Sequence, residues 1–213
     1  MPLWLQEFLI HISFLIIAAI VNDMGVIASA SVGLVNKIFN PFAVIPSAIG
    51  GAIAAISAQN IGAGRRDRAI KAMGFGILYS GIIEAIIMVW ALAAPETITA
   101  FFAEGKMDVI AGAAAHLRLF SIDLILLSAI FCMNAHLNAC GKANFTTLHS
   151  LISTFAIRVP LSFLLARVGT DLNNSLLLLG LAAPLATLGS LIICAPYLYR
   201  YEKKQRRAPA EAL

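Results

Sequence analysis

The feature that most limits the fold is the length of the uncharged stretches. One of them runs for 27 residues, from Ile38 to Gly64. A helix needs about 20 predominantly apolar residues to cross the roughly 30 Å hydrocarbon core of a bilayer. Only helices and closed barrels satisfy their backbone hydrogen bonds there, and barrel strands are short segments of alternating polarity. We therefore expect an all-α integral membrane protein.

Apolar stretches separated by turn residues or charges predict a bundle of six transmembrane helices. The composition agrees, because 60% of the residues are hydrophobic and 12% are charged, whereas soluble domains are about 25% charged. The N-terminal segment MPLWLQEFLIH lacks the basic n-region of a signal peptide, so we expect its helix to be retained. The predicted helices lie at 4–22, 28–61, 68–94, 112–138, 145–167 and 174–199, and a basic tail follows at 200–213.

The positive charges lie in alternate connections, which predicts how the helices are oriented. Lys106 and Arg167 are alone on one side, whereas cytoplasmic connections generally keep an excess of lysine and arginine. We therefore expect a multi-pass protein with both termini in the cytoplasm. Nucleic acid is not an expected partner, because each basic cluster adjoins a membrane helix. The basic residues of the predicted cytoplasmic side are Arg65, Arg66, Arg68, Lys71, Lys142, Arg200, Lys203, Lys204, Arg206 and Arg207.

Small residues recur every four positions along the second predicted helix. Such a stripe lets a neighbouring helix approach closely, so we expect this helix to be a central packing element. The glycines that end the stripe do not form a nucleotide-binding loop, because Asp67 replaces the third glycine of that motif. The stripe consists of Gly50, Ala54, Ala58 and Gly62.

Charged and polar residues inside the predicted spans are the candidates for an ion or substrate pathway, because such residues are costly in a membrane. Counting along the helices at 1.5 Å per residue places the titratable ones about 14 to 16 Å deep, in one layer. Lys37 lies beside the helix bend expected at Pro41 and Pro46, and Glu84 is a possible ionic partner for it. The candidates are His11, Asn36, Lys37, Asn40, Glu84, Asp123 and Arg158.

Asp123 and Arg158 lie at similar distances on either side of the turn at Gly141. Antiparallel neighbouring helices would place the two side chains together. They either form a buried ion pair that holds the helices, or Asp123 exchanges Arg158 for a proton, a cation or a substrate during transport.

No pattern indicates catalysis, a cofactor or a metal. The three cysteines, Cys132, Cys140 and Cys194, lie in apolar surroundings without CxxC spacing, and we interpret them as packing residues. No histidine pair shares a helical face with a carboxylate at metal-ligand spacing. There is no GxS motif of the kind that an intramembrane serine protease needs. We therefore do not expect an enzyme.

Three segments resemble the MATE family of transporters, and the similarity is to the C-terminal half of those proteins. HISFLIIAAIVNDMG (11–25) resembles the seventh helix, and FAVIPSAIGGAIAAISAQNIGAGRRDRA (42–69) resembles the eighth helix and the loop after it. AQNIGAG with its basic cluster and LNACGKANFT (137–146) end the second and fourth predicted helices. The resemblance covers nearly the whole chain.

The resemblance implies a twelve-helix antiporter of two six-helix lobes that exports organic cations or drugs in exchange for sodium ions or protons. The expected partners are the bilayer, a small organic cation and a second lobe, either an N-terminal half or a second copy. The expected location is a prokaryotic plasma membrane. The acidic residues of sodium-coupled members would fall near Ile10 and Leu127, and neither is acidic here. The alternatives are a lipid-linked oligosaccharide flippase of similar architecture and a non-transporting membrane assembly partner.

Overall fold

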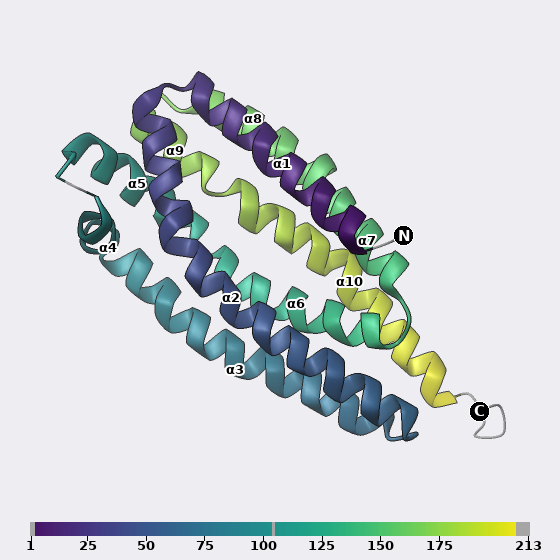
Figure 1. The fold of residues 1–213 in the computed structure, drawn as a ribbon. Helices are drawn as coiled ribbons and strands as arrows, with labels where there is room; N and C mark the ends of the chain where they lie inside the picture. Colours follow the sequence, from purple (N-terminus) through teal and green to yellow (C-terminus); the bar gives the residue numbers. More distant parts are fainter. Residues whose placement is uncertain (1–2, 104, 208–213) are drawn as a thin grey trace.

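The structure is a computed structural model that describes residues 3–103 and 105–207, and all regular elements within them are helical (Figure 1). The confirmed fold class is therefore all-α. The elements are α1 (Leu3–Asp23), α2 (Val26–Gly62), α3 (Arg66–Ala93), α4 (Pro95–Phe102), α5 (Met107–Phe120), α6 (Asp123–Ala139), α7 (Ala143–Ile152), the π-helical segment η1 (Ser153–Arg158), α8 (Val159–Val168), α9 (Leu172–Leu179) and α10 (Ala182–Arg207).

Four stretches among the described residues are long and apolar enough to cross a membrane. They are α2, α3, the run α7–η1–α8 and the run α9–α10. A fifth consists of α5 and α6, which meet at an angle of 45°. The segment Phe8–Asp23 of α1 is apolar but shorter. The order of these stretches follows the order of the predicted helices.

The structure differs from the predicted helices in four places. The connection expected at 94–108 contains α4, which begins at Pro95, a residue whose fixed φ suits the first turn of a helix. The helices predicted at 112–138 and 174–199 are each interrupted, at Ser121–Ile122 and at Gly180–Leu181. The tail expected from residue 200 is helical as far as Arg207, because Glu202 packs against α3 and α6.

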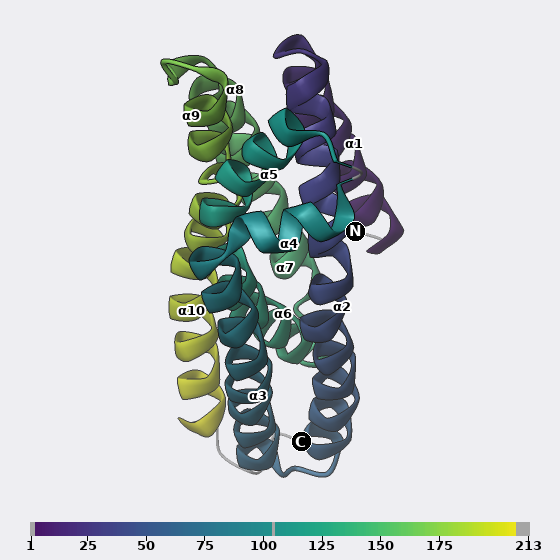
Figure 2. The same ribbon diagram turned by 90° about the vertical axis from the view of Figure 1, so that its left-hand side faces the viewer.

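Helix α2 is the central packing element, because it contributes to each of the three hydrophobic clusters found among the described residues. Val35 and Phe39 lie with α5 and α6, Ile53 lies with α3, α6 and α10, and Ala28 lies with α1, α8 and α9. In Figure 2, α2 runs from the top to the bottom of the view, and α3 lies beside its lower part.

Only part of the small-residue stripe on α2 lies in this interior. Gly50 is buried, and a Cβ there would lie 3.5 Å from the carbonyl oxygen of Phe131 in α6. Ala54 is half-buried, whereas Ala58 and Gly62 are exposed. The buried face turns instead through Ile53 and Ser57, since an α-helix repeats every 3.6 residues and a strict spacing of four drifts around it.

Gly180 allows the interruption between α9 and α10 to lie directly against α5. A Cβ at this position would be 2.6 Å from the carbonyl oxygen of His116 and 3.1 Å from the amide nitrogen of Phe120. Any larger residue would push the two segments apart, so the breaks that follow Phe120 and Leu179 touch each other.

The irregular segment η1 has an identifiable cause. Pro160 has no N–H to donate to the carbonyl of Ala156, and its ring displaces the preceding turn. The hydroxyl of Ser153 in η1 donates a hydrogen bond to the carbonyl oxygen of Ala186 in α10. This hydrogen bond fixes η1, which ends at Arg158, against α10.

Candidate functional site

A cavity of about 350 Å³ lies between α1, α2, α5, α8 and the α9–α10 break. Its wall is mainly apolar, and its polar groups include Asn36, His116 and Arg158. Because apolar cavities with a few polar groups are the usual form of small-molecule sites, this cavity is the first candidate site.

Arg158 and His116 are held in this cavity by specific contacts. The guanidinium of Arg158 lies over the ring of Phe14 from α1, 4.5 Å from its centroid. His116 in α5 forms a 2.9 Å hydrogen bond through Nδ1 with the carbonyl oxygen of Leu176 in α9, and its ring stacks on Phe120. His116 was not among the predicted site residues, since the sequence places it near the predicted outer boundary.

Asp123 is the first residue of α6, directly after the break, and it is buried. It lies near Arg158, and the two groups interact electrostatically. Within the described residues, however, no ion pair of 4.0 Å or less joins them. Thr187 in α10 lies close to the carboxylate, while Oδ1 has no hydrogen-bond partner in the described part of the chain. Asp123 and Arg158 are therefore neighbours, but not a closed ion pair.

Glu84 is a second buried carboxylate, separate from the cavity. It lies on the buried face of α3, one turn beyond Ser80, and it is completely inaccessible to solvent. Neither of its oxygens has a partner among residues 3–103 and 105–207, so the possible pairing with Lys37 is not present. A carboxylate without partners in such surroundings is costly to keep charged.

The other predicted pathway residues lie toward the surface. Asn36 is half-buried and lines the cavity, whereas Lys37 and Asn40, which follow it on α2, are exposed. His11 is also exposed, one turn before Phe14 on α1. The structure thus brings Asn36, Asp123 and Arg158 to one region and leaves His11, Lys37 and Asn40 on the outside of this chain.

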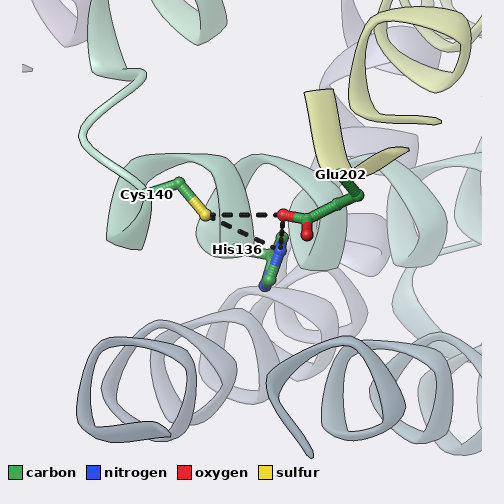
Figure 3. A group of neighbouring side chains, drawn as sticks. All are labelled: His136, Cys140 and Glu202. Atoms are coloured by element: carbon green, nitrogen blue, oxygen red, sulfur yellow. Dashed lines mark hydrogen bonds and ion pairs between the residues drawn. The ribbon is translucent and has the colours of Figure 1, made fainter. Parts of the chain in front are cut away.

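A second polar cluster lies at the other end of the bundle, where α6, α10 and the start of α3 meet (Figure 3). Glu202 in α10 accepts hydrogen bonds from Arg66, 3.1 Å away, and lies 3.1 Å from Nε2 of His136. Nδ1 of His136 lies 3.0 Å from the hydroxyl of Ser57 in α2, and Cys140 is within 4 Å of both His136 and Glu202. Sequence reasoning missed this cluster, because it treated residues from 200 onward as a tail.

His149 joins three elements by hydrogen bonds. Its Nδ1 lies 2.8 Å from Oγ of Ser190 in α10, and its Nε2 lies 3.0 Å from Oδ1 of Asn134 in α6. Both ring nitrogens of His149 therefore form hydrogen bonds that connect α7 to its neighbouring helices.

Comparison with known proteins gives the family. The family model MatE matches residues 2–164 of the 213. The chain belongs to the MATE family. The MATE chain is also 25% identical over 205 residues to "Probable multidrug resistance protein YoeA" of Bacillus subtilis (strain 168). The match covers 96% of this chain and 43% of that relative.

Solved MATE structures have the same fold. One, described as an inward-facing conformation of a multidrug resistance MATE family transporter of the MOP superfamily, matches 93% of this chain with a TM-score of 0.74 and 12% identity. Another, a MATE protein in complex with MaD3S, matches 95% with a TM-score of 0.75 and 16% identity. The matched regions are 46% and 44% of those chains, so this multi-pass membrane chain spans less than half the length of the proteins it matches.

Proposed function

We propose that this chain forms one lobe of a secondary antiporter that exports organic cations or drugs in exchange for sodium ions or protons. The main support is that almost the whole chain matches less than half of MATE transporters, both in sequence and in fold. Such transporters place their substrate between two repeats that move relative to each other. The second lobe is either a separate N-terminal half or a second copy of this chain.

The exposed polar residues support the need for a second lobe. His11, Lys37 and Asn40 are accessible on α1 and α2, within otherwise apolar helices. Exposing a charged side chain to hydrocarbon costs several kcal/mol, so these groups need either water or a protein partner. We assign them to the surface that faces the second lobe and the central cavity.

Glu84 and Asp123 are the proposed positions for the coupling ion. Both are buried, and each has at least one oxygen without a partner in the described residues. Binding of a proton or a sodium ion would neutralise such a carboxylate, and its release would restore the cost of a buried charge. Arg158 near Asp123 would compete with the ion, which links occupancy of Asp123 to the state of the cavity.

Several features support a prokaryotic plasma membrane location with both termini in the cytoplasm. The similar multidrug resistance protein is from a bacterium, Bacillus subtilis. In Figure 1 the α2–α3 turn and the end of α10 lie at the same end of the molecule. Arg66 contacts Glu202 there, and Lys142 lies over the ring of Tyr201. The basic residues therefore gather on one side, as the excess of positive charge on cytoplasmic loops requires.

One observation favours a second candidate function. Among the described residues that line the cavity, Arg158 is the residue with a permanent charge, and it is positive. A guanidinium binds phosphate groups well. A flippase for a lipid-linked oligosaccharide, whose carrier is anionic, is therefore the alternative.

The decisive experiment is transport by the chain together with a six-helix partner in proteoliposomes. We expect efflux of a fluorescent organic cation driven by a sodium or proton gradient, and loss of the gradient dependence in Glu84→Gln and Asp123→Asn. Glu96→Gln is the matched control, because Glu96 is exposed and pairs with Arg118 near the surface. Movement of a fluorescent lipid-linked sugar, without any of the cation, would favour the flippase. Coupled efflux by a purified monomer would contradict the one-lobe proposal.

A further inference from the structure

The polar cluster at the end of α6 contains three different metal-ligating atoms at close range. Nε2 of His136, Sγ of Cys140 and a carboxylate oxygen of Glu202 all lie within 4.8 Å of one another. His136 lies in the last turn of α6, Cys140 is the residue directly after that helix, and Glu202 reaches them from α10. Figure 3 shows the three side chains pointing toward one another.

The separations between these atoms match the edges of a tetrahedral zinc site. Zinc bonds of about 2.0 Å to oxygen, 2.05 Å to nitrogen and 2.3 Å to sulfur give edges of about 3.3 Å for N–O, 3.6 Å for N–S and 3.5 Å for S–O. The observed distances are 3.1 Å from Nε2 to Oε1, 3.7 Å from Sγ to Nε2 and 3.8 Å from Sγ to Oε1. We propose that His136, Cys140 and Glu202 bind a zinc ion, with water or an exogenous ligand in the fourth position.

The surroundings of His136 hold its ring in the orientation that a metal ligand needs. Nδ1 lies 3.0 Å from the hydroxyl of Ser57, and both residues are completely buried. When Nδ1 carries the proton and donates it to Ser57, the lone pair of Nε2 points toward Cys140 and Glu202. In metal-binding histidines, the N–H group of the second ring nitrogen usually donates a hydrogen bond to a fixed acceptor in this way.

Arg66 is the group that competes with the ion, and the geometry lets it remain beside the site. Its Nη1 lies 3.1 Å from Oε1 and 3.4 Å from Oε2 of Glu202. Zinc at Oε1 would leave Oε2 as the acceptor for Arg66, so the guanidinium would change from a competitor to an outer partner of the ligand. Binding also displaces the thiol proton of Cys140 and any proton on Nε2 of His136 to solvent.

An ion at this position would fix four helices together at one end of the lobe. Glu202 lies on α10, His136 lies on α6, and Cys140 directly follows α6. Ser57 connects the site to α2, and Arg66 connects it to α3. Cys140 is half-buried at the turn after α6, which gives the ion a route to the site. This site lies outside the proposed transport cavity, and no residue contributes to both.

Titration of the purified chain with Co²⁺, a spectroscopic substitute for zinc, tests the site. We expect one equivalent to bind, with a thiolate-to-cobalt charge-transfer band and the intense visible bands of a tetrahedral complex, and zinc should displace it. The charge-transfer band should disappear in Cys140→Ser and persist in Cys194→Ser, since Cys194 is buried elsewhere in the bundle. A band that is unchanged in Cys140→Ser, or absent from the unmodified chain, would overturn the proposal.

Two further measurements do not depend on the folding of ligand variants. In membranes containing the unmodified chain, zinc should protect Cys140 from alkylation by N-ethylmaleimide, whereas magnesium should not. Ser57→Ala keeps all three ligands and should weaken zinc binding about 10- to 100-fold, the usual effect of removing an outer hydrogen bond. Equal alkylation with and without zinc would exclude the site in the native chain.

Discussion

Nη1 of Arg66 and Oε1 of Glu202 lie 3.1 Å apart, although 136 residues separate them in the chain. The pair connects the first residue of α3 with the last turns of α10. Both side chains are largely buried, with 24% and 10% of their surfaces exposed. A neighbouring pair, Arg206 with Asp67, connects the same two helices at 3.0 Å but is mostly exposed.

The two pairs provide a matched test of how much burial contributes. Glu202→Gln should lower the free energy of unfolding by about 1–3 kcal/mol, because it leaves the Arg66 guanidinium partly buried without a charged partner. Arg206→Gln should change it by less than about 1 kcal/mol, as is usual for exposed pairs. Unfolding in mixed micelles, followed by circular dichroism, measures both. Equal effects would mean that burial does not strengthen the Arg66–Glu202 pair.

Gly76 should be among the most sensitive glycines of α3. A Cβ there would lie 2.9 Å from Cδ1 of Ile53 and 3.2 Å from Sγ of Cys132. Gly76→Ala should therefore cost about 1–3 kcal/mol of stability through overpacking. Gly74→Ala is the control, because its Cβ would meet nothing within 4 Å and alanine favours the helix by roughly 0.5–1 kcal/mol. If Ile53→Ala in addition does not restore Gly76→Ala, overpacking is not the cause.

Asp123→Asn distinguishes a structural from a functional role for this carboxylate. Asparagine has nearly the same shape as aspartate, and no closed ion pair is lost in the described structure. The free energy of unfolding should therefore change by less than about 1.5 kcal/mol, the net value of an ordinary hydrogen bond. Ion-coupled efflux by the assembled transporter should be lost. A loss of about 3–5 kcal/mol would indicate a buried ion pair with Arg158 instead.

The proposed orientation can be tested by labelling single cysteines with an impermeant maleimide. Ala63→Cys and Thr170→Cys place exposed thiols at opposite ends of the bundle without changing a charge. Cys140→Ser removes the one partly exposed native thiol among the described cysteines, since Cys132 and Cys194 are buried. In intact cells we expect labelling at position 170 and protection at position 63. The reverse pattern would invert the proposed topology.

The sequence predicted the fold class and the approximate place of each apolar segment, because the length of an uncharged run is a property of the chain alone. It did not predict the breaks at Ser121 and Gly180. Both lie within apolar runs, and the reason for them is a contact between α5 and the α9–α10 junction. Long-range contacts of this kind leave no local pattern.

For the candidate site too, local sequence patterns could be predicted and long-range contacts could not. Asp123 and Arg158 could be selected from the sequence because each is a charge within an apolar run, and the short hairpin between them predicts a similar depth. Counting along helices could not show which way a side chain faces, so Lys37 was grouped with Asn36 although they lie on different sides of α2. His136 and Cys140 had a recognisable spacing of four, but their partner Glu202 lies 62 residues beyond Cys140.

The contact of Gly180 with the amide of Phe120 also determines where the backbone is easiest to open. At the same level, the two neighbouring runs leave the regular pattern of hydrogen bonds four residues back. Ile122 and Leu181 donate instead to the carbonyl oxygens three residues back, those of Leu119 and Leu178. Straight membrane helices exchange their amide hydrogens fastest at their ends. Here, deuterium should enter first at an internal level, around residues 121–122 and 180–181, and reach the helices on either side more slowly.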